Sequence, residues 1–263
     1  MIKSDERFEG EAGRYADYLR TAEGRLRLDI SWAHLVEALR EFGGGAKGRV
    51  LDVGGGTGAL SLRLAAKGWY VNLVDSSQAM LALAREAASR ESLPSRVAFE
   101  HADAAFVDKL YSPDSFDLVI CHNLLEYVAD PSAVLKAIGR VTRRGGLVSL
   151  VARNRAGEAL RAALKLHDFP QAEHALRAET VRESLYGGPA RLFDPPTLRT
   201  LAEEHGFDVV AERGVRVVAD YLPPSLNATD EAYARLCSLE QKLGARADFA
   251  AVARYLQIIA RRR

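Results

Sequence analysis

The sequence predicts a doubly wound α/β fold. Three observations predict it: short apolar runs alternate with helical segments, a glycine-rich turn follows the first run, and polar residues end several runs. Alternation of this kind gives right-handed crossovers between parallel strands. A chain of 263 residues with 48% apolar and 27% charged residues can bury one large core with helical additions, or two small domains.

Each element follows from a local pattern. Strands are expected where β-branched and apolar residues run together, and helices where apolar residues recur at helical spacing. The expected strands are 49–53, 70–75, 96–100, 116–121, 147–152, 207–218 and 255–261. The expected helices are 8–42, 59–67, 78–90, one starting at Asp130-Pro131, 197–204 and 230–243, with Gly43-Gly44-Gly45 ending the first. Residues 154–189 show no convincing strand pattern and are expected to be a helical insertion.

Bulk composition excludes several classes of protein. The net charge is +1, so a nucleic acid or an anionic membrane would have to bind a local patch. Cys121 and Cys237 have neither metal-ligand spacing nor a disulfide framework, which fits a reducing compartment, and no metal site is expected. No apolar leader or run long enough to cross a bilayer is present in the sequence, and we expect a soluble, cytoplasmic protein.

The glycine-rich turn carries the first chemical signal. Its glycines, Gly54, Gly56 and Gly58, have Gly-x-Gly-x-Gly spacing, whereas dinucleotide-binding folds use Gly-x-Gly-x-x-Gly. Asp52 stands two residues before the first glycine. This form resembles motif I of class I methyltransferases that use S-adenosylmethionine (SAM), whose cationic end suits an acidic flank. The simpler alternative is an ordinary strand-to-helix turn.

Asp75 strengthens the interpretation of the turn as a SAM site. It ends the apolar run that follows the turn, where a carboxylate can accept both hydroxyls of a ribose. Taken alone, Asp75 could equally be a surface carboxylate at the end of a strand.

The chain as a whole resembles the bacterial tRNA 5-carboxymethoxyuridine methyltransferase family. The resemblance rests on Gly24-Arg25-Leu26-Arg27, the glycine turn, Asp75 with Ser77-Gln78-Ala79-Met80, His122 through Asp130-Pro131, and Gly214 to Leu222. It implies a Rossmann-like, seven-stranded sheet with an antiparallel last strand. It also implies methyl transfer from SAM to the carboxylate of the modified wobble uridine in tRNA.

The resemblance also assigns site residues. For the cofactor it implies Arg27 on the methionine carboxylate, the glycine turn on the cofactor backbone, Asp75 on the ribose, two residues beside the adenine, and a histidine lining the pocket. The residues so implied, together with the acidic flank, are Arg27, Asp52, Gly54, Gly55, Gly56, Asp75, Asp103, Ala104 and His122. For the methyl acceptor it implies Arg216, Asn154 and Tyr221 as positioning residues, with no general base.

The residues themselves leave two of these roles open. Arg216 interrupts an apolar strand and could be an edge arginine that points to water. His122 could be a packed strand-end histidine, a cofactor-lining residue, or a general base if the acceptor has a proton to lose. Asp194-Pro195-Pro196 looks like the (Asn/Asp)-Pro-Pro box of amino-methylating enzymes, but it precedes a late helix and is interpreted as a helix start.

Four segments follow from this interpretation. Residues 1–45 are expected to form a helical preamble over the cofactor site, 46–153 the SAM-binding core, 154–190 a substrate-facing insertion, and 191–263 the strands that complete the sheet. Within the preamble, Arg25 and Arg27 are expected on a solvated face unless one reaches the cofactor. From Arg153 to Arg191 the chain has seven Lys/Arg and five Asp/Glu, so the insertion is only mildly basic.

The acceptor is the open question. A tRNA would be contacted through local arginines, of which Arg140, Arg143, Arg144, Arg153, Arg155 and Arg261-Arg262-Arg263 are the candidates, although they could equally form a solvated basic face. The alternative is O- or N-methylation of a small molecule, with leucines 160, 164, 166 and 176 closing an apolar pocket. A non-catalytic SAM-binding protein and an NAD-dependent dehydrogenase fit the residues less well. The sequence does not indicate an oligomeric state.

Overall fold

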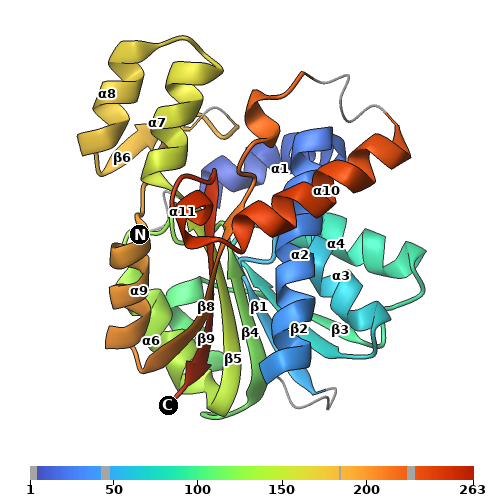
Figure 1. Ribbon diagram of the computed structural model, residues 1–263. Helices are drawn as coiled ribbons and strands as arrows, with labels where there is room; N and C mark the ends of the chain where they lie inside the picture. The colour runs from blue at the N-terminus through green and yellow to red at the C-terminus, as the bar shows by residue number, and fades with distance from the viewer. Residues whose placement is uncertain (1–4, 43–47, 184, 224–228) are drawn as a thin grey trace.

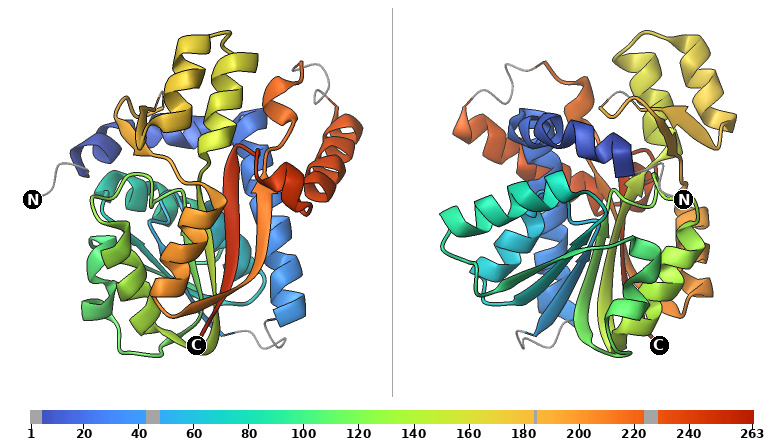
Figure 2. Two further views of the ribbon diagram at one scale, coloured as in Figure 1. Left: turned by 60° about the vertical axis from the view of Figure 1, so that its left-hand side comes forward. Right: turned by 180° about the vertical axis from the view of Figure 1, so that it is seen from behind.

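A seven-stranded sheet forms the centre of the protein in the computed structural model, which describes residues 5–42, 48–183, 185–223 and 229–263. Helices cover both faces of the sheet, and further helices gather at one end of it (Figures 1 and 2). The strand order is β3-β2-β1-β4-β5-β9-β8. Strand β9 lies between β5 and β8 and is antiparallel to both, while the β1, β2, β3, β4 and β5 neighbours pair in parallel. The predicted doubly wound fold with an antiparallel last strand is confirmed.

The strands of this sheet occupy the runs that the sequence predicts, with small shifts at their ends, except that the fifth strand begins at Thr142 instead of the predicted residue 147. They are β1 (Arg49–Val53), β2 (Tyr70–Asp75), β3 (Val97–His101), β4 (Phe116–His122), β5 (Thr142–Arg153), β8 (Phe207–Val215) and β9 (Tyr255–Arg262). The prediction that β8 extends to Val218 is wrong. The strand ends at Val215 because Arg216 has a φ of 62°, in the left-handed region that breaks an extended chain.

The helices cover the two faces of the sheet and the end at which the parallel strands finish. They are α1 (Asp5–Arg20), α2 (Ala22–Phe42), α3 (Ala59–Ala66), α4 (Gln78–Arg90), α5 (Val107–Leu110), α6 (Pro131–Val141), α7 (Arg155–Leu164), α8 (Phe169–Arg177), α9 (Pro195–Glu204), α10 (Asp230–Gly244) and α11 (Ala247–Ala250), with short 3₁₀ turns η1 (Ala104–Phe106) and η2 (Ala219–Tyr221). Asp130 and Asp194 cap α6 and α9, each with proline in the first turn, as the sequence predicts. No described helix is long and apolar enough to cross a bilayer.

Two apolar cores stabilise the sheet, one on each face. Helices α5, α6 and α9 cover the core around Phe116, Ile138 and Phe207. Helices α2, α3 and α4 cover the other, around Leu35, Leu64 and Leu81. Each of these side chains is at most 1% exposed, so burial on both faces is complete at the central strands.

The predicted single helix over residues 8–42 is two helices. The chain turns at Thr21, and Gly24 packs so tightly against α1 that a Cβ there would lie 2.1 Å from the Tyr18 carbonyl oxygen. The expected end of this helix at Gly43-Gly44-Gly45 lies outside the described residues. The turn sends α1 across the carboxyl ends of the parallel strands, while α2 packs along the face of the sheet (Figures 1 and 2).

The insertion is mostly helical, but the expectation that it lacks strands is wrong. After α7 and α8, a short antiparallel hairpin forms from β6 (Thr180–Arg182) and β7 (Pro189–Arg191). The two strands have three residues each, too few to give a readable alternation of apolar and polar residues. The buried side chains of Ala159, Ala175, Val181 and Leu192 hold the insertion together as a small separate cluster.

Candidate functional site

A cavity of about 300 Å³ opens at the carboxyl ends of the parallel strands. One side is formed by the glycine turn and the ends of β2, β3 and β4, and the other by α1, α2, the insertion and the ends of β5, β8 and β9. Open α/β sheets place their ligands at this edge. The residues that line the cavity are Phe8, Arg14, Tyr15, Tyr18, Glu23, Arg27, Gly54, Gly56, Asp75, Ser76, Met80, Ala102, Ala104, His122, Asn123, Leu124, Glu126, Tyr127, Arg153, Arg161, Glu183, Leu185, Tyr186, Arg216, Arg254 and Tyr255.

The glycine turn forms the floor of one half of the cavity. Gly54 and Gly56 have φ values of 69° and 55°, and a Cβ on Gly54 would lie 2.8 Å from Leu124 Cδ1. Gly56 N–H donates to Asp75 Oδ2 at 2.8 Å, and Ser77 N–H donates to Asp75 Oδ1 at 2.9 Å. These two bonds fix the Asp75 carboxylate at the cavity wall and leave it lone pairs for ligand hydroxyls.

Asp52 and Gly55 lie beneath the turn instead of on the main cavity. Both line a smaller recess that shares Gly54 and His122 with the cavity. Asp52 Oδ2 accepts a hydrogen bond from Ser61 Oγ at 2.7 Å, and burial raises the Asp52 pKa to about 6. Asp52 therefore supports the turn from behind, where a ligand in the main cavity would not touch it.

Of the two residues predicted to lie beside the adenine, one lines the cavity and the other does not. Ala104 lines the cavity. The Asp103 carboxylate accepts from Ala105 N–H at 2.8 Å and caps η1, and it does not line the cavity.

Arg27 reaches the cavity from α2, so the expectation of a solvated face fails for it. Its side chain is buried because α1 crosses above it, and it donates to Tyr15 Oη at 2.9 Å. Its guanidinium also lies 5.2 Å from the Tyr18 ring centre. No ion pair joins Arg27 to a carboxylate among the described residues, whereas Arg153, Arg216 and Arg254 each pair with two.

His122 ends β4 and lines the cavity. Its Nε2 lies 2.7 Å from Ser149 Oγ. Burial, and then the nearby charge of Arg27, lower its pKa to about 3. The ring is therefore neutral at physiological pH and a weak base, which does not favour the general-base interpretation.

Arg216 faces the cavity from the other half, so the alternative of a water-facing edge arginine is wrong. Its side chain is 2% exposed and forms an ion pair with the equally buried Asp220. It also donates to Tyr18 Oη at 3.1 Å, and Glu23 lies 3.3 Å from its Nη2. The buried Arg216 Nε has no hydrogen-bond partner.

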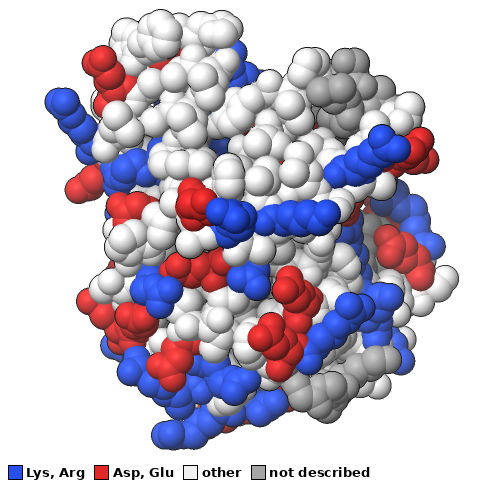
Figure 3. Space-filling view, in the orientation of Figure 1, with Lys and Arg blue, Asp and Glu red and all other residues white. Residues whose placement is uncertain are grey.

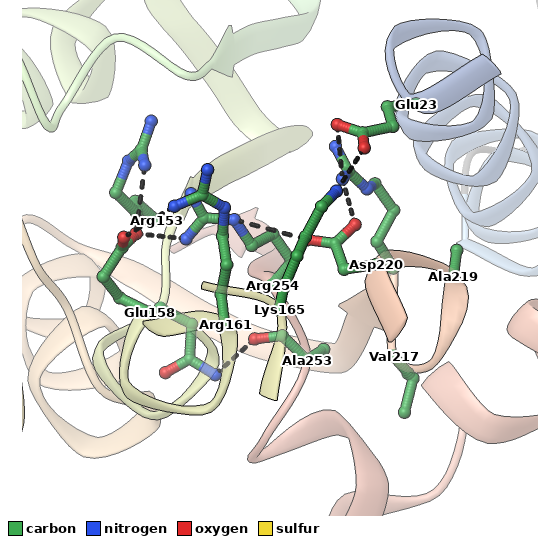
Figure 4. Close-up of polar contacts among 12 residues, drawn as sticks. Glu23, Arg153, Glu158, Arg161, Lys165, Val217, Ala219, Asp220, Ala253 and Arg254 are labelled. Carbon is green, nitrogen blue, oxygen red and sulfur yellow. Dashed lines mark hydrogen bonds and ion pairs between the residues drawn. The ribbon is translucent and has the colours of Figure 1, made fainter. Parts of the chain in front are cut away.

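A second buried ion-pair network surrounds Glu158 (Figure 4). Glu158 of α7 pairs with Arg153 at 3.1 Å and with Arg254, and Arg161 reaches the same carboxylate at 3.7 Å. Arg254 also lies 3.6 Å from Asp220, which links the two networks. The cavity wall on this side is thus rich in guanidinium groups that are paired with carboxylates, among them Glu183, which lies 3.4 Å from Arg153.

Tyr255 stands at the centre of these arginines. The guanidinium carbons of Arg27, Arg216 and Arg254 lie 5.8, 5.9 and 5.5 Å from its ring centre. Although burial by itself would raise its pKa, the surrounding guanidinium charges, that of Arg254 foremost, lower it. Its ring lies beside both Arg27 and Arg216.

Asn154 and Tyr221, expected on the acceptor, do not line the cavity. Asn154 caps α7, and its side-chain amide donates to the carbonyl oxygens of Ala251 and Ala253 at 2.9 and 2.7 Å. Tyr221 ends η2 and is half-buried away from the lining. Asn154 therefore holds the start of α7 on the loop before β9.

Several lining residues were not expected from the sequence. Phe8, Tyr15, Tyr127 and Tyr186 form an aromatic cluster in which ring centres lie 4.8 to 6.0 Å apart. Glu126 is buried with its Oε2 unpartnered, and burial raises its pKa. Arg153 and Tyr255 could have been found, since β5 ends and the antiparallel β9 begins at this edge of the sheet.

The residues of the Arg27 half fit SAM. A buried guanidinium without a carboxylate partner matches the methionine carboxylate, the Asp75 carboxylate matches ribose hydroxyls, and the glycine turn allows close approach. Among the described residues no group of His, Cys, Asp and Glu could hold a metal ion.

Comparisons with known proteins agree with this geometry. A family model described as a methyltransferase domain matches residues 50–146. Over 245 residues, 92% of this chain and 90% of the relative, the sequence is 32% identical to the tRNA 5-carboxymethoxyuridine methyltransferase of Escherichia coli strain K12. It is 33% identical to a ubiquinone biosynthesis O-methyltransferase of Paracidovorax citrulli over 64% of this chain and 66% of the relative. The magnesium protoporphyrin IX methyltransferase of Synechocystis, solved with bound SAH, shares the fold with a TM-score of 0.65 at 15% identity, covering 98% of both chains.

Proposed function

This chain belongs to the tRNA 5-carboxymethoxyuridine methyltransferase family of class I SAM-dependent methyltransferases, and on that premise we propose that it esterifies the carboxylate of 5-carboxymethoxyuridine at the tRNA wobble position. The chain is a SAM-dependent methyltransferase. The observation that supports a carboxylate acceptor is Arg216, a second buried guanidinium that lines the cavity beside Tyr255.

The two halves of the cavity would hold the two reactants. We assign Arg27 to the methionine carboxylate, Asp75 to the ribose and Ala104 to the adenine side, with Gly54 and Gly56 against the cofactor backbone. SAM supplies a methyl group on a cationic sulfur. Residues 1–45 would cover this half, and residues 154–190 would face the acceptor, since α1 and the insertion both line the cavity.

For methyl transfer to a carboxylate, the protein has only to position the two reactants. An acceptor carboxylate is ionised near neutral pH, so no proton has to be removed, and the neutral His122 need not act as a base. Arg216 would hold one carboxylate oxygen and leave the other directed at the methyl group. The aromatic cluster of Phe8, Tyr15, Tyr127 and Tyr186 would exclude water around the reacting atoms.

The arginines expected to bind tRNA do not gather at the cavity. Arg153 lies inside the cavity, and Arg155 donates to the Ala178 carbonyl oxygen within the insertion. Arg143 and Arg144 lie at the start of β5, and Arg261 to Arg263 lie at the end of β9. Both groups are therefore at the end of the sheet opposite to the cavity. Figure 3 shows basic side chains gathered at this lower end of the molecule, where the C-terminus lies.

Arg14, Arg161 and Lys165 lie nearer the cavity, so we propose that tRNA approaches from α1 and α7. A tRNA substrate also favours a cytoplasmic enzyme.

A small acceptor remains the second candidate, because ubiquinone biosynthesis O-methyltransferases are among the relatives. The expected apolar lid does not support it. Leu164, Leu166 and Leu176 are exposed, and neither they nor Leu160 lines the cavity. The lining from the insertion is Arg161, Glu183, Leu185 and Tyr186, which suits a charged acceptor better.

Transfer of label from radioactive SAM tests the proposal. The enzyme is offered tRNA from cells that lack wobble-uridine ester methylation and, separately, a small-metabolite fraction. Label that enters tRNA and is released by mild alkali is the expected result, because a methyl ester hydrolyses under those conditions. Label found only in small molecules would show that the acceptor assignment is wrong while methyl transfer is right.

A further inference from the structure

Glu23 is a carboxylate placed where the substrate's carboxylate is expected. It projects from α2 into the cavity, with 47% of its side chain exposed, and its Oε2 lies 3.3 Å from Arg216 Nη2. Its other oxygen, Oε1, lies 2.5 Å from Nζ of Lys165, the residue that ends α7 (Figure 4). One carboxylate thus joins the N-terminal helices to the insertion across the mouth of the acceptor half.

Cations from two separate elements converge on this carboxylate. Arg216 comes from the end of β8, while Lys165 and Arg161 come from α7. Burial by itself would raise the Glu23 pKa, but Arg216, Lys165 and Arg161 together lower it. The Glu23 carboxylate is therefore ionised at neutral pH, and it occupies the anion site that Arg216, Lys165 and Arg161 form.

Arg216 is held differently by its two carboxylate partners. Asp220 is 2% exposed and four residues away on the same loop, so it stays with Arg216 whatever the cavity contains. Glu23 is half-exposed and has Lys165 as a second partner. Only the Glu23 pair can be exchanged without leaving a buried charge alone.

We propose that Glu23 occupies the position on Arg216 that the acceptor carboxylate takes, and that a bound acceptor displaces Glu23 onto Lys165. This inference rests on the proposed carboxylate acceptor. The exchange replaces one carboxylate by another on the same guanidinium, so Arg216 keeps its charge balance throughout. Glu23 is thereby a specificity-determining residue that selects against acceptors without a negative charge.

The same exchange acts on the product. Methyl transfer converts the acceptor carboxylate into a neutral ester, which no longer competes for the guanidinium. Glu23 then returns to Arg216 and helps to expel the ester. The protein therefore contains its own competitor, which weakens the binding of the charged substrate and, more strongly, that of the neutral product.

Two variants separate this exchange from a simple latch between α2 and α7. Glu23→Gln removes the competing charge, so the Kd of tRNA carrying 5-carboxymethoxyuridine should fall about two- to fivefold, the factor expected for a half-exposed ion pair. Lys165→Met removes the group that receives the displaced carboxylate, so this Kd should rise by a larger factor than the Kd of the methyl ester, which does not replace Glu23 on Arg216. Loss of a phosphate contact alone would raise both Kd values by the same factor. A latch predicts that both variants shift the Kd in the same direction, because both break the same ion pair.

The binding experiment uses the full chain saturated with S-adenosylhomocysteine, with filter binding of the acid-bearing tRNA and of its methyl ester. Glu231→Gln is the matched control, since it removes the same charge from an exposed ion pair with Arg235 on α10. It should leave both Kd values unchanged. A Glu23→Gln variant with an unchanged or higher Kd for the acid-bearing tRNA overturns the exchange. Failure of the wild-type enzyme to bind or methylate that tRNA counts instead against the proposed function.

Discussion

Arg216 and Asp220 form an ion pair in which each side chain is only 2% exposed. The pair exists because Arg216 adopts a φ of 62° directly after β8, which turns the chain and directs the arginine into the cavity. A non-glycine residue in this region costs about 1 kcal/mol, so the loop must be held by other contacts. The buried Glu240 of α10 supplies them, accepting from the N–H groups of Val217, Val218 and Ala219 at 2.6, 3.0 and 2.7 Å. Arg216 is therefore a preorganised site residue.

Replacing Arg216 by alanine should lower kcat with the acid-bearing tRNA by at least about 100-fold, as loss of a preorganised donor does. The Kd of SAM should stay within about twofold of wild type, because the methionine carboxylate is assigned to Arg27 and the acceptor carboxylate to Arg216. Steady-state kinetics and calorimetric titration with SAM measure the two quantities. A large loss of SAM affinity would show that the role of Arg216 is misassigned.

Loss of folding is the competing explanation for this variant. Arg216→Ala leaves Asp220 buried with only Arg254, at 3.6 Å, and should cost up to about 3 kcal/mol of unfolding free energy. The double variant Arg216→Ala/Asp220→Ala removes both charges and should recover part of that loss. If turnover also recovers in the double variant, the defect of the single variant was one of stability.

Replacing Arg27 by alanine should weaken SAM binding by about 10- to 100-fold, since a hydrogen-bonded charge pair contributes about 1.5–3 kcal/mol. Arg27 is the buried cavity arginine that has no carboxylate partner among the described residues, so the ligand must supply one. Titration calorimetry with SAM measures the effect. Arg25→Ala is the control, because Arg25 is on the same helix but more than half exposed. Equal losses in the two variants would contradict a direct contact.

The sequence predicts the sheet and the cofactor half of the site because both are local. The glycine spacing, the carboxylate at the end of β2 and the arginine of α2 each lie within one element and its turn. The acceptor half depends on distant parts of the chain, since Glu23, Glu158 and Asp220 meet their arginines only after α1, α7 and η2 have packed together. Ion pairs of this kind leave no spacing pattern. For the same reason the sequence does not show that the Asn154 amide donates to the carbonyl oxygens of Ala251 and Ala253.

The rate should be independent of pH between about 7 and 9 when SAM and tRNA are saturating. His122, with a pKa lowered to about 3, stays neutral over that range, and the acceptor carboxylate stays ionised. A general base that titrates near neutrality would instead make kcat rise tenfold per pH unit below its pKa. The kcat profile measured with acid-bearing tRNA decides between them.

Asp52→Asn should stabilise the protein more at pH 8 than at pH 4. Burial raises the Asp52 pKa from 3.8 to about 6, so the folded state holds a proton that the unfolded state has lost. The stability that this proton contributes is complete below pH 3.8 and disappears as the pH rises through 6. At pH 8 the wild type therefore bears the full cost of ionising Asp52, of the order of 3 kcal/mol, and asparagine avoids it. Urea unfolding of both proteins at the two pH values measures the difference in unfolding free energy. An equal difference at pH 4 and pH 8 would mean that the pKa of Asp52 is not raised.

Arg161→Gln should raise the KM for tRNA, whereas Arg144→Gln should leave it unchanged. Arg161 lines the cavity from α7, and its ion pair with Glu158 is long, at 3.7 Å, so its guanidinium can also reach a phosphate. Arg144 is exposed at the start of β5, at the far edge of the sheet. KM measured at several salt concentrations tests both variants, since loss of one phosphate contact lowers the slope of log KM against log salt by about 1. If the Arg144 variant shows the smaller slope and the Arg161 variant does not, tRNA binds at the opposite end of the sheet from the one proposed.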